Sequence, residues 1–387
     1  MVTVSPEPHY SLDVMGLGDT KCHVMRLEMS CKHPLKGFYT FQQNSLQTLK
    51  DYDFKSVRLK SNRKIKVVPY RVNHLELIDG RLVCRYDDEV SRFAKAVYKD
   101  FTEIPCGRCI ECRLKRSREW ANRCMLELPY HESSYFLTLT YDDNHLRYGD
   151  VHDENGFLVQ NPTLYKKDLQ DFFKRLRKNY KYDNHLKYYA CGEYGDNTGR
   201  PHYHCIIFGL KLDDLQVYKQ SRLGFNYYNS SFINSIWTFG HVVIADVSWE
   251  TCAYTARYIL KKQLGLSSDY YDEVNILPEF NVMSLKPAIG YEYFRDHKDE
   301  IYDLDTIYLK TQTKGLKIKP PKYFDNKMSE NLEDAYLLQG VRAVRQEVAD
   351  LQKKHKLEQT DLDYLDVLQI EEDLIKTRVR SLYRKEI

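Results

Sequence analysis

The stretch GEYGDNTGRPHYHCIIFGL, residues 192–210, indicates a β-hairpin with two histidines at the start of its second strand. The turn-rich segment GDNTGRP separates LKYYACGEY from HYHCIIFGL, and both flanks have the aromatic and apolar residues of strands. Alternate side chains of a strand share a face, so His202 and His204 point the same way and Tyr203 points the other way. If the hairpin has a symmetric register, Glu193 lies opposite His202 and Cys191 lies opposite His204. All four side chains then share one face.

This group of side chains predicts a site for a divalent metal ion. Two imidazoles at alternate strand positions can chelate one ion, and Glu193 is a natural third ligand. Imidazole together with hard carboxylate oxygen suits Mg²⁺ or Mn²⁺ and leaves coordination positions open for phosphate chemistry. The alternative, that His202 and His204 only cap a strand end beside a polar turn, stays open.

The neighbouring segments predict an α+β fold with a central antiparallel sheet and helices packed on it. Further strands are expected at 135–141 (YFLTLTY) and 237–247, and helices at 162–181 and 251–262. Thr163 is the expected N-cap of the helix 162–181, one side of which is lined by leucine and phenylalanine. Basic residues in the C-terminal half of that helix suit its dipole, and they also offer a surface to phosphates.

Two tyrosines in the helix 251–262 are candidate nucleophiles. Tyr254 and Tyr258 are four residues apart and therefore share a helix face, with Lys261 near the same face and Lys262 beside it. A phenol is a poor nucleophile at its ordinary pKa near ~10, but a metal that polarises the phosphate and a nearby lysine would help it attack. The product would be a phosphotyrosine link to DNA. In a chain with 32 tyrosines, such a pair is also common in protein cores.

A cysteine cluster predicts a second metal site. Cys106, Cys109 and Cys112 occur in CGRCIEC, at a spacing that lets several thiolates bind one Zn²⁺. Cys31, in the loop-like CKHP, is the first choice for the fourth ligand and Cys124 the second. An iron–sulfur cluster, or no metal at all, are the alternatives. A helix begins at about Glu111, and its basic residues face either DNA phosphates or solvent.

Composition limits the class of protein. The chain has 387 residues, 42% hydrophobic and 29% charged, and a net charge of +3, so any nucleic-acid surface must be local. The ten cysteines are clustered, and MVTVSPEPHY has neither a basic start nor an apolar core, so we expect reduced thiols and no secretory signal. No run of 18 apolar residues occurs, and we expect no membrane partner.

The order FLTLTY, RPHYHCIIFG, YTARYILKK resembles the three motifs of HUH endonucleases, which start rolling-circle replication. More narrowly, the chain resembles the replication initiators of microviruses, in particular the gokushovirus group. That match rests on PCGRCIECRLKRSREWANRC from Pro105, GEYGDNTGRPHYHCIIFG from Gly192 and FNVMSLKPAIGYEYF from Phe280, with SCKHP from Ser30. It spans roughly residues 28–325. Ala288 stands where a glycine is expected, and Glu111 where a small residue is expected.

The resemblance implies roles for the residues already singled out. His202 and His204 would be the metal-binding pair, Glu193 a third ligand, and Tyr254 and Tyr258 the paired nucleophiles. One tyrosine would cut the origin of a double-stranded circle and hold the 5′ phosphate, and the second would act when the origin is regenerated. The fold implied is the RRM-like HUH palm. The residues expected to contact DNA are Arg113, Lys115, Arg116, Lys174, Arg175, Arg177, Lys178 and Lys262.

Three regions are expected: an N-terminal region 1–130 with the cysteine site, a catalytic core 131–327, and a charged C-terminal arm 328–387. In the arm, Val341, Val344, Val348 and Leu351 recur at helical spacing, which predicts a helical hairpin or a short coiled coil. Expected partners are single- and double-stranded circular DNA at the origin, with host helicase and polymerase as candidates, in the host bacterial cytoplasm. The alternatives are a non-catalytic, zinc-dependent DNA-binding protein and a relaxase or transposase of the same chemistry.

Overall fold

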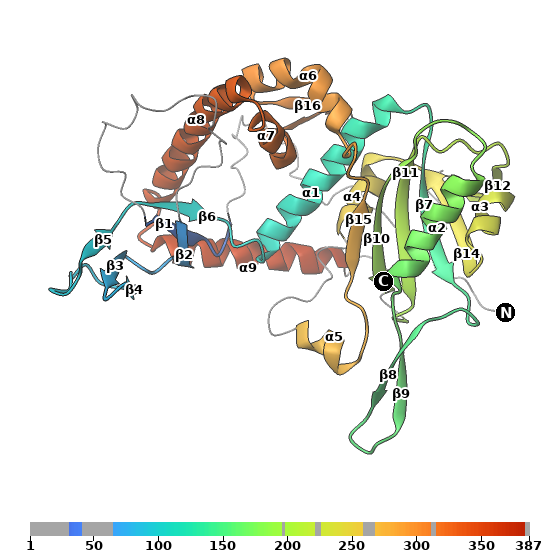
Figure 1. The fold of residues 1–387 in the computed structure, drawn as a ribbon, viewed down its shortest axis with the longest axis horizontal. Helices are drawn as coiled ribbons and strands as arrows, with labels where there is room; N and C mark the ends of the chain where they lie inside the picture. The colour runs from blue at the N-terminus through green and yellow to red at the C-terminus, as the bar shows by residue number, and fades with distance from the viewer. Residues whose placement is uncertain are drawn as a thin grey trace. The chain divides into compact units, whose positions relative to one another are not determined.

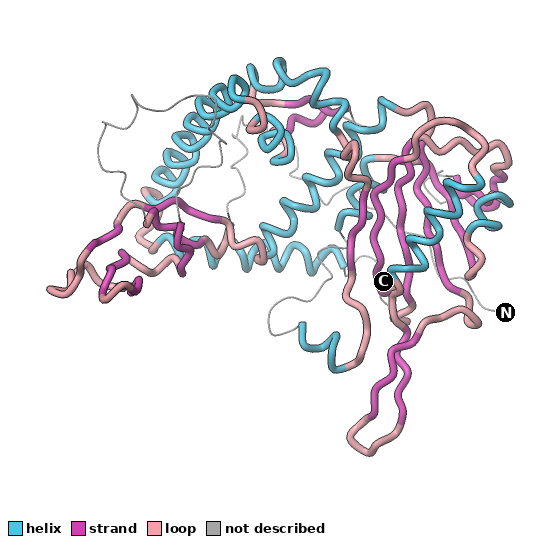
Figure 2. The backbone as a smooth tube through the Cα atoms, viewed as in Figure 1, coloured by secondary structure: helices cyan, strands magenta, loops and turns pink. Residues whose placement is uncertain are grey.

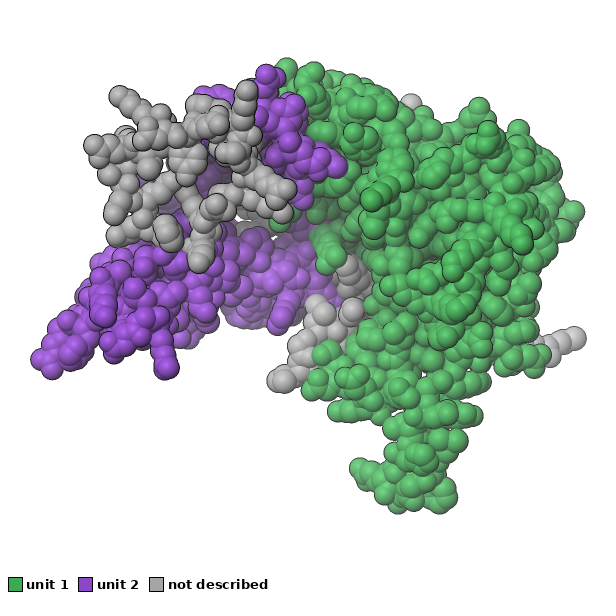
Figure 3. All heavy atoms as spheres, in the orientation of Figure 1, with its two compact units in different colours: residues 1–19, 116–324 green, residues 20–115, 325–387 purple. Residues whose placement is uncertain are grey.

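A computed structural model of the chain describes residues 31–40, 65–195, 198–220, 226–257, 268–310 and 315–383. The chain divides into two compact units, shown in Figure 3. The first unit contains residues 1–19 and 116–324, and the second contains residues 20–115 and 325–387.

One antiparallel sheet organises the first unit, with the strand order β12-β13-β14-β7-β11-β10-β15 (Figure 1). Its strands are Ser134–Tyr141 (β7), Lys187–Tyr194 (β10), Pro201–Phe208 (β11), Gln216–Gln220 (β12), Asn226–Asn229 (β13), Gly240–Asp246 (β14) and Phe280–Met283 (β15). The predicted central antiparallel sheet is confirmed, and so are the strands expected at 135–141 and on both sides of the turn in 192–210. The histidine-bearing strand β11 lies inside the sheet, between β7 and β10.

The sheet buries both of its faces. On one face, which we call the α2 face, Leu139, Tyr203 and Ile207 pack with Phe172 and other apolar residues of the helix Lys166–Asn179 (α2). The opposite face, which we call the α4 face, packs against the helices Ile110–Glu127 (α1) and Trp249–Arg257 (α4). Small residues such as Ala121, Ala253 and Ala256 lie in that second interface, and they let the helices approach the sheet closely.

The first unit has further short elements. They are a 3₁₀ turn Leu128–Tyr130, the strands Tyr148–His152 (β8), Leu158–Pro162 (β9), Ile307–Lys310 (β16) and Gly315–Ile318 (β17), and the helices Ser231–Ile236 (α3), Asp269–Glu273 (α5) and Tyr291–Leu304 (α6). The helix Lys322–Met328 (α7) and helix α1 each cross from one unit to the other along the chain.

The start of the helix predicted at 162–181 is wrong, as is its cap. Asn161 and Pro162 pair with Gly149 and Tyr148 in a β8–β9 hairpin, which Figure 2 shows extending from the sheet. Because the hairpin uses those residues, α2 begins only at Lys166. The hydroxyl of Thr163 instead accepts a hydrogen bond from the Leu277 amide (2.8 Å). The sequence predicted a loop where the hairpin lies, since its polar strands carry little apolar alternation.

The second unit combines two small sheets and two long helices. The sheets have the orders β2-β1-β6 and β4-β3-β5. The elements are Leu35–Tyr39 (β1), Ile65–Pro69 (β2), His74–Ile78 (β3), Arg81–Arg85 (β4), Ala96–Tyr98 (β5), Phe101–Ile104 (β6), Leu332–Leu357 (α8) and Tyr364–Tyr383 (α9). Phe38, Val68, Val72 and Leu75 form its apolar cluster.

The helical character predicted for the C-terminal arm is confirmed by α8 and α9, which diverge from their short connection in Figure 1. The domain boundaries predicted at 130 and 327 stay a prediction. Within the described ranges, no helix combines the length and the apolar character that a membrane crossing requires.

Candidate functional site

The predicted register of the histidine hairpin is confirmed. In the β10–β11 pair, Glu193 lies opposite His202 and Cys191 lies opposite His204. Strand alternation places all four on the α4 face, whereas Tyr203 packs in the core of the α2 face, as expected. Gly195 ends the hairpin loop beside the ring of His202, where a Cβ would come within 3.1 Å of Nε2. The small residue at this position therefore leaves room for that ring.

One pair of the three expected ligands is in direct contact. His204 Nε2 lies 2.8 Å from Glu193 Oε1, and both side chains are buried. Two ligands that each stand about 2.1 Å from one ion are separated by about 3 Å, so this spacing fits adjacent positions on a metal. Imidazole nitrogen and carboxylate oxygen are ligand types that Mn²⁺ and Mg²⁺ accept.

His202 is held nearby but does not close a three-ligand group. Among the residues that the structure describes, the four cysteines form the group of three or more ligating side chains whose ligand atoms all lie within 4.8 Å. His202 Nδ1 instead lies 3.0 Å from Thr140 Oγ1 on β7, and His204 Nδ1 lies 3.1 Å from Thr138 Oγ1. The histidine pair is therefore oriented from its Nδ1 side by the neighbouring strand.

Tyr254 reaches this face from helix α4. Its ring contacts the His204 ring edge-to-face, with centroids 5.1 Å apart, and lies 6.2 Å from the ring of Phe136. The flanking Cys252, Ala253 and Ala256 are buried, so the helix packs closely enough for the tyrosine to meet the histidine. The other residues expected in this helix, Tyr258, Lys261 and Lys262, lie outside the described residues.

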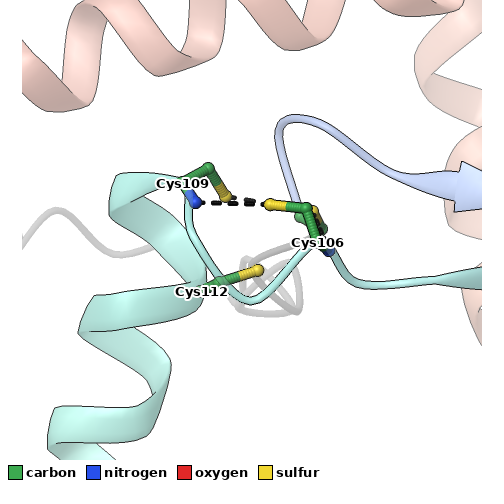
Figure 4. A group of neighbouring side chains, drawn as sticks. Cys106, Cys109 and Cys112 are labelled. Atoms are coloured by element: carbon green, nitrogen blue, oxygen red, sulfur yellow. Dashed lines mark hydrogen bonds between the residues drawn. The ribbon is translucent and has the colours of Figure 1, made fainter. Parts of the chain in front are cut away.

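The second candidate site brings the four predicted cysteines together. Cys31, Cys106, Cys109 and Cys112 have sulfur atoms within 4.8 Å of one another, and Figure 4 shows three of the side chains converging. Cys31 is thus the partner of the CGRCIEC loop, whereas Cys124 is buried in the core of the first unit. This arrangement matches the expectation that Cys31 rather than Cys124 completes the cluster.

Backbone amides point at the sulfurs of this cluster. The Cys109 and Arg108 amides lie 3.3 and 3.4 Å from Cys106 Sγ, and the Cys106 amide lies 3.2 Å from Cys31 Sγ. Gly107 makes the tight loop possible with a φ of +73°. Amide donors of this kind stabilise thiolates, the form of cysteine that binds metal.

The thiol of Cys109 is the most easily ionised of the group. A hydrogen bond from Cys31, 3.8 Å away between sulfurs, lowers the pKa of Cys109 despite the opposing effect of burial. Cys109 also immediately precedes the N-terminus of α1, where the helix dipole favours an anion. The donor set therefore fits a tetrahedral thiolate site such as that of Zn²⁺.

The basic residues expected to contact DNA are spread over several surfaces. Lys174, Arg175, Arg177 and Lys178 are on α2, which covers the sheet face opposite to the histidines. Arg175 donates to the Ile236 carbonyl (3.0 Å), so that side chain also serves packing. Arg116 acts electrostatically on Tyr189 of the α4 face, whereas Arg113 and Lys115 belong to the second unit.

Sequence reasoning missed the residues of the neighbouring strands that share the α4 face. Thr138 and Thr140 pair with His204 and His202 across β7, and His241 of β14 lies opposite Thr140. The repeated threonine in FLTLTY was the available signal, because alternate positions of a strand share a face.

Comparisons with known proteins agree on one family. A family model for replication-associated proteins of the ORF2 type matches residues 134–263, which include the histidine hairpin and Tyr254. The chain is 34% identical to the replication-associated protein ORF2 of Spiroplasma virus 4 over 287 residues, which are 73% of this chain and 85% of that protein. It is 31% identical to the replication-associated protein VP4 of Bdellovibrio phage phiMH2K, over 67% of this chain and 80% of that protein.

A third relative is the replication-associated protein ORF4 of Chlamydia phage 1, with 31% identity over 57% of this chain and 52% of that protein. No solved structure matches the chain, so the HUH palm remains a prediction beyond the observed α+β sheet. The identity to the Spiroplasma and Bdellovibrio phage proteins extends over most of their lengths. The chain belongs to the family of replication-associated proteins of microviruses.

Proposed function

We propose that this chain initiates rolling-circle replication of a small circular phage DNA by nicking its origin. The observation that carries the proposal is the contact between Tyr254 and His204, whose Nε2 also meets Glu193. A nucleophile candidate and two metal-ligand candidates thus share one sheet face, within the segment matched by the replication family.

In the proposed reaction the phenol oxygen of Tyr254 attacks the phosphorus of one phosphodiester of the origin. The bond from phosphorus to the 3′ oxygen breaks, and that oxygen takes up a proton and becomes a free 3′ hydroxyl. The phenol loses its proton, and the 5′ phosphate stays on the protein as a tyrosine ester. Attack by the 3′ hydroxyl on the same ester would reverse the step and rejoin the strand.

Glu193, His202 and His204 are the residues that would hold the catalytic Mg²⁺ or Mn²⁺. When bound, the ion would polarise the scissile phosphate and neutralise charge that develops on it. The edge-to-face packing of Tyr254 on His204 orients the phenol, because aromatic pairs favour that geometry over free rotation. Tyr258 is proposed as the second nucleophile, with Lys261 lowering the cost of ionising a phenol.

The four-cysteine cluster is proposed to hold a structural Zn²⁺. All four positions of a tetrahedral site are filled by thiolates, which leaves none for a reacting group. Single- and double-stranded origin DNA are the proposed substrates, host helicase and polymerase the candidate partners, and the host bacterial cytoplasm the site of action. Family membership favours a replication initiator over a relaxase or transposase of the same chemistry.

The test uses the protein and its own supercoiled genome with Mg²⁺ or Mn²⁺. A denaturing gel would detect DNA with covalently attached protein for wild type, Tyr254→Phe, Tyr258→Phe and the double variant. We expect an adduct in wild type that weakens in a single variant and disappears in the double variant.

Nicking without an adduct would mean that water is the nucleophile and would remove the tyrosines from the mechanism. Tight origin binding without nicking in either metal would support the non-catalytic, zinc-dependent DNA-binding protein instead. Tyr336→Phe is a suitable control, because that tyrosine is exposed on α8.

A further inference from the structure

Strand β7 presents a hydroxyl to each histidine of the candidate site. In the β7–β11 register, Thr138 lies opposite His204 and Thr140 lies opposite His202. The threonine oxygens lie 3.1 and 3.0 Å from the Nδ1 atoms of those rings. Both contacts are thus the same cross-strand pair, repeated one strand period apart.

These contacts decide which nitrogen of each ring carries the proton. A neutral imidazole has one N–H and one bare nitrogen, and only the bare nitrogen can bind a metal ion. If Thr accepts a hydrogen bond from Nδ1–H, the Nε2 lone pair is available for the ion. A hydroxyl can accept or donate, so a threonine is compatible with either tautomer.

The contact between His204 and Glu193 calls for the opposite arrangement when no ion is bound. His204 Nε2 lies 2.8 Å from a carboxylate oxygen, so Nε2 carries the proton and donates it. Nδ1 is then bare, and the Thr138 hydroxyl donates to it. On ion binding, one proton leaves Nε2 and one is taken up at Nδ1 from solvent, while the Thr138 hydroxyl changes from donor to acceptor. The ring keeps its position, and its net charge does not change.

Threonine is frequent in strands because its branched side chain suits the pleated surface, and one such contact would have little meaning. Here both histidines of the pair are contacted at the same ring atom, by residues at alternate positions of one strand. The third expected ligand, Glu193, is on the other neighbouring strand, β10. The histidines are therefore supported from β7 and meet the carboxylate from β10.

We propose that Thr138 and Thr140 are positioning residues that set the tautomer and ring orientation of His204 and His202 for a divalent ion. This inference rests on the proposed metal site and adds the residues that prepare it. Outer partners of metal-binding histidines typically contribute about 10- to 100-fold in metal affinity.

The test measures Mn²⁺ affinity without DNA, from the electron paramagnetic resonance signal of free Mn²⁺. The variants are Thr138→Val and Thr140→Val, which keep the branched shape but lose the hydroxyl, and Thr138→Ser and Thr140→Ser, which keep the hydroxyl. We expect about 10- to 100-fold weaker binding in the valine variants and near-wild-type binding in the serine variants. The ¹⁵N shifts of the imidazoles in metal-free protein should change in the valine variants only.

The outcomes separate this inference from the proposed function. If His204→Ala loses Mn²⁺ binding while both valine variants bind as wild type does, the inference is overturned and the metal site stands. If serine and valine variants lose affinity equally, the hydroxyl is not the cause, and the inference is again overturned. The adduct assay with Tyr254→Phe and Tyr258→Phe tests the nicking chemistry independently, because neither substitution touches the threonines.

Discussion

Tyr203 lies between the two histidines in the sequence but anchors their strand from the opposite face. Its hydroxyl lies 2.9 Å from the Tyr141 hydroxyl, accepts from the Tyr165 amide (2.8 Å) and donates to the Tyr165 carbonyl (3.0 Å). Tyr141 in turn donates to buried Asp168 (2.8 Å). Burial raises the pKa of Tyr203, so the hydroxyl stays protonated and can donate. This network holds β11 in place behind the candidate site.

We therefore expect Tyr203→Phe to lower the free energy of unfolding by about 1–2 kcal/mol, because it leaves buried polar partners without a hydrogen bond. Urea denaturation followed by circular dichroism would measure the change. Tyr336→Phe, at a largely exposed position, should stay within about 0.5 kcal/mol of wild type. Equal stability of both variants would show that the network contributes nothing.

At the scale of elements, a buried carboxylate joins three segments of the first unit. Glu127, in the last turn of α1, contacts His131 Nε2 and Lys187 Nζ, each at 2.7 Å, and accepts from the Gly290 amide at 2.6 Å. Lys187 starts β10, and Gly290 caps α6. Burial alone would raise the pKa of Glu127, but these hydrogen bonds together hold it below its ordinary value.

This network predicts a pH-dependent contribution to stability. The folded pKa of Glu127 is lower than the unfolded value near ~4.3, so its contribution is present above that pH and is lost as the pH falls through the folded pKa. Glu127→Gln should cost about 3 kcal/mol of unfolding free energy at pH 7, since it leaves buried Lys187 without this charged partner. The difference from wild type should shrink below about pH 4. Denaturation at several pH values would test this, with exposed Glu132→Gln as the control, and a pH-independent difference would contradict it.

The cysteine loop and helix α9 are coupled by ion pairs next to a metal-ligand candidate. Lys32 and His33 follow Cys31 directly, and they contact Glu371 (2.6 Å) and Glu372 (3.0 Å) of α9. Lys32 and Glu372 are buried, so these pairs are shielded from solvent. The position of Cys31 therefore fixes the residues on which α9 rests.

We expect removal of zinc with a chelator, or Cys31→Ser, to speed hydrogen exchange in peptides from 364–383. The physical reason is that release of Cys31 frees Lys32 and His33 from their contacts with α9. Hydrogen exchange with mass spectrometry would measure the effect. Cys84→Ser, a cysteine outside the cluster, is the matched control. Unchanged exchange of α9 in the metal-depleted protein would refute this coupling.

At the scale of the whole molecule, the second unit is built from both ends of the described chain. Lys353 of α8 lies over the Tyr364 ring of α9 (3.8 Å), and the Tyr364 ring contacts that of Tyr70 (5.7 Å). Leu338 and Leu368 are buried. The C-terminal helices thus contribute to the unit that holds the cysteine site.

A chain that ends at residue 328 should therefore lose more than two helices. We expect its segment 65–115 to be cleaved by a non-specific protease faster than in the full chain, because the partners of Tyr70 and Glu103 on α8 are gone. Mass spectrometry of the fragments would locate the cuts. The central sheet, residues 134–208, serves as the internal control. Equal resistance of 65–115 in both chains would show that the helices are an independent arm.

The sequence by itself determined the central hairpin and most of the site on it. Period-two alternation, a glycine-rich turn and residues close in sequence suffice to place Glu193 opposite His202, because a hairpin register depends on local geometry. The helical character of 332–383 follows from periodicity in the same way. The nucleophile role of Tyr254 and the metal roles of Glu193, His202 and His204 stay predictions.

Only the tertiary structure decided which distant segments meet. Cys31 joins a loop that lies 75 residues further along the chain, and the N-terminal sheets share a unit with the C-terminal helices. The hydroxyls of Thr138 and Thr140 meet the histidines because β7 happens to be the neighbour of β11, whereas the basic residues of α2 lie behind the sheet. Strand order and the face that a helix covers depend on long-range packing, which leaves no periodic signal in the sequence.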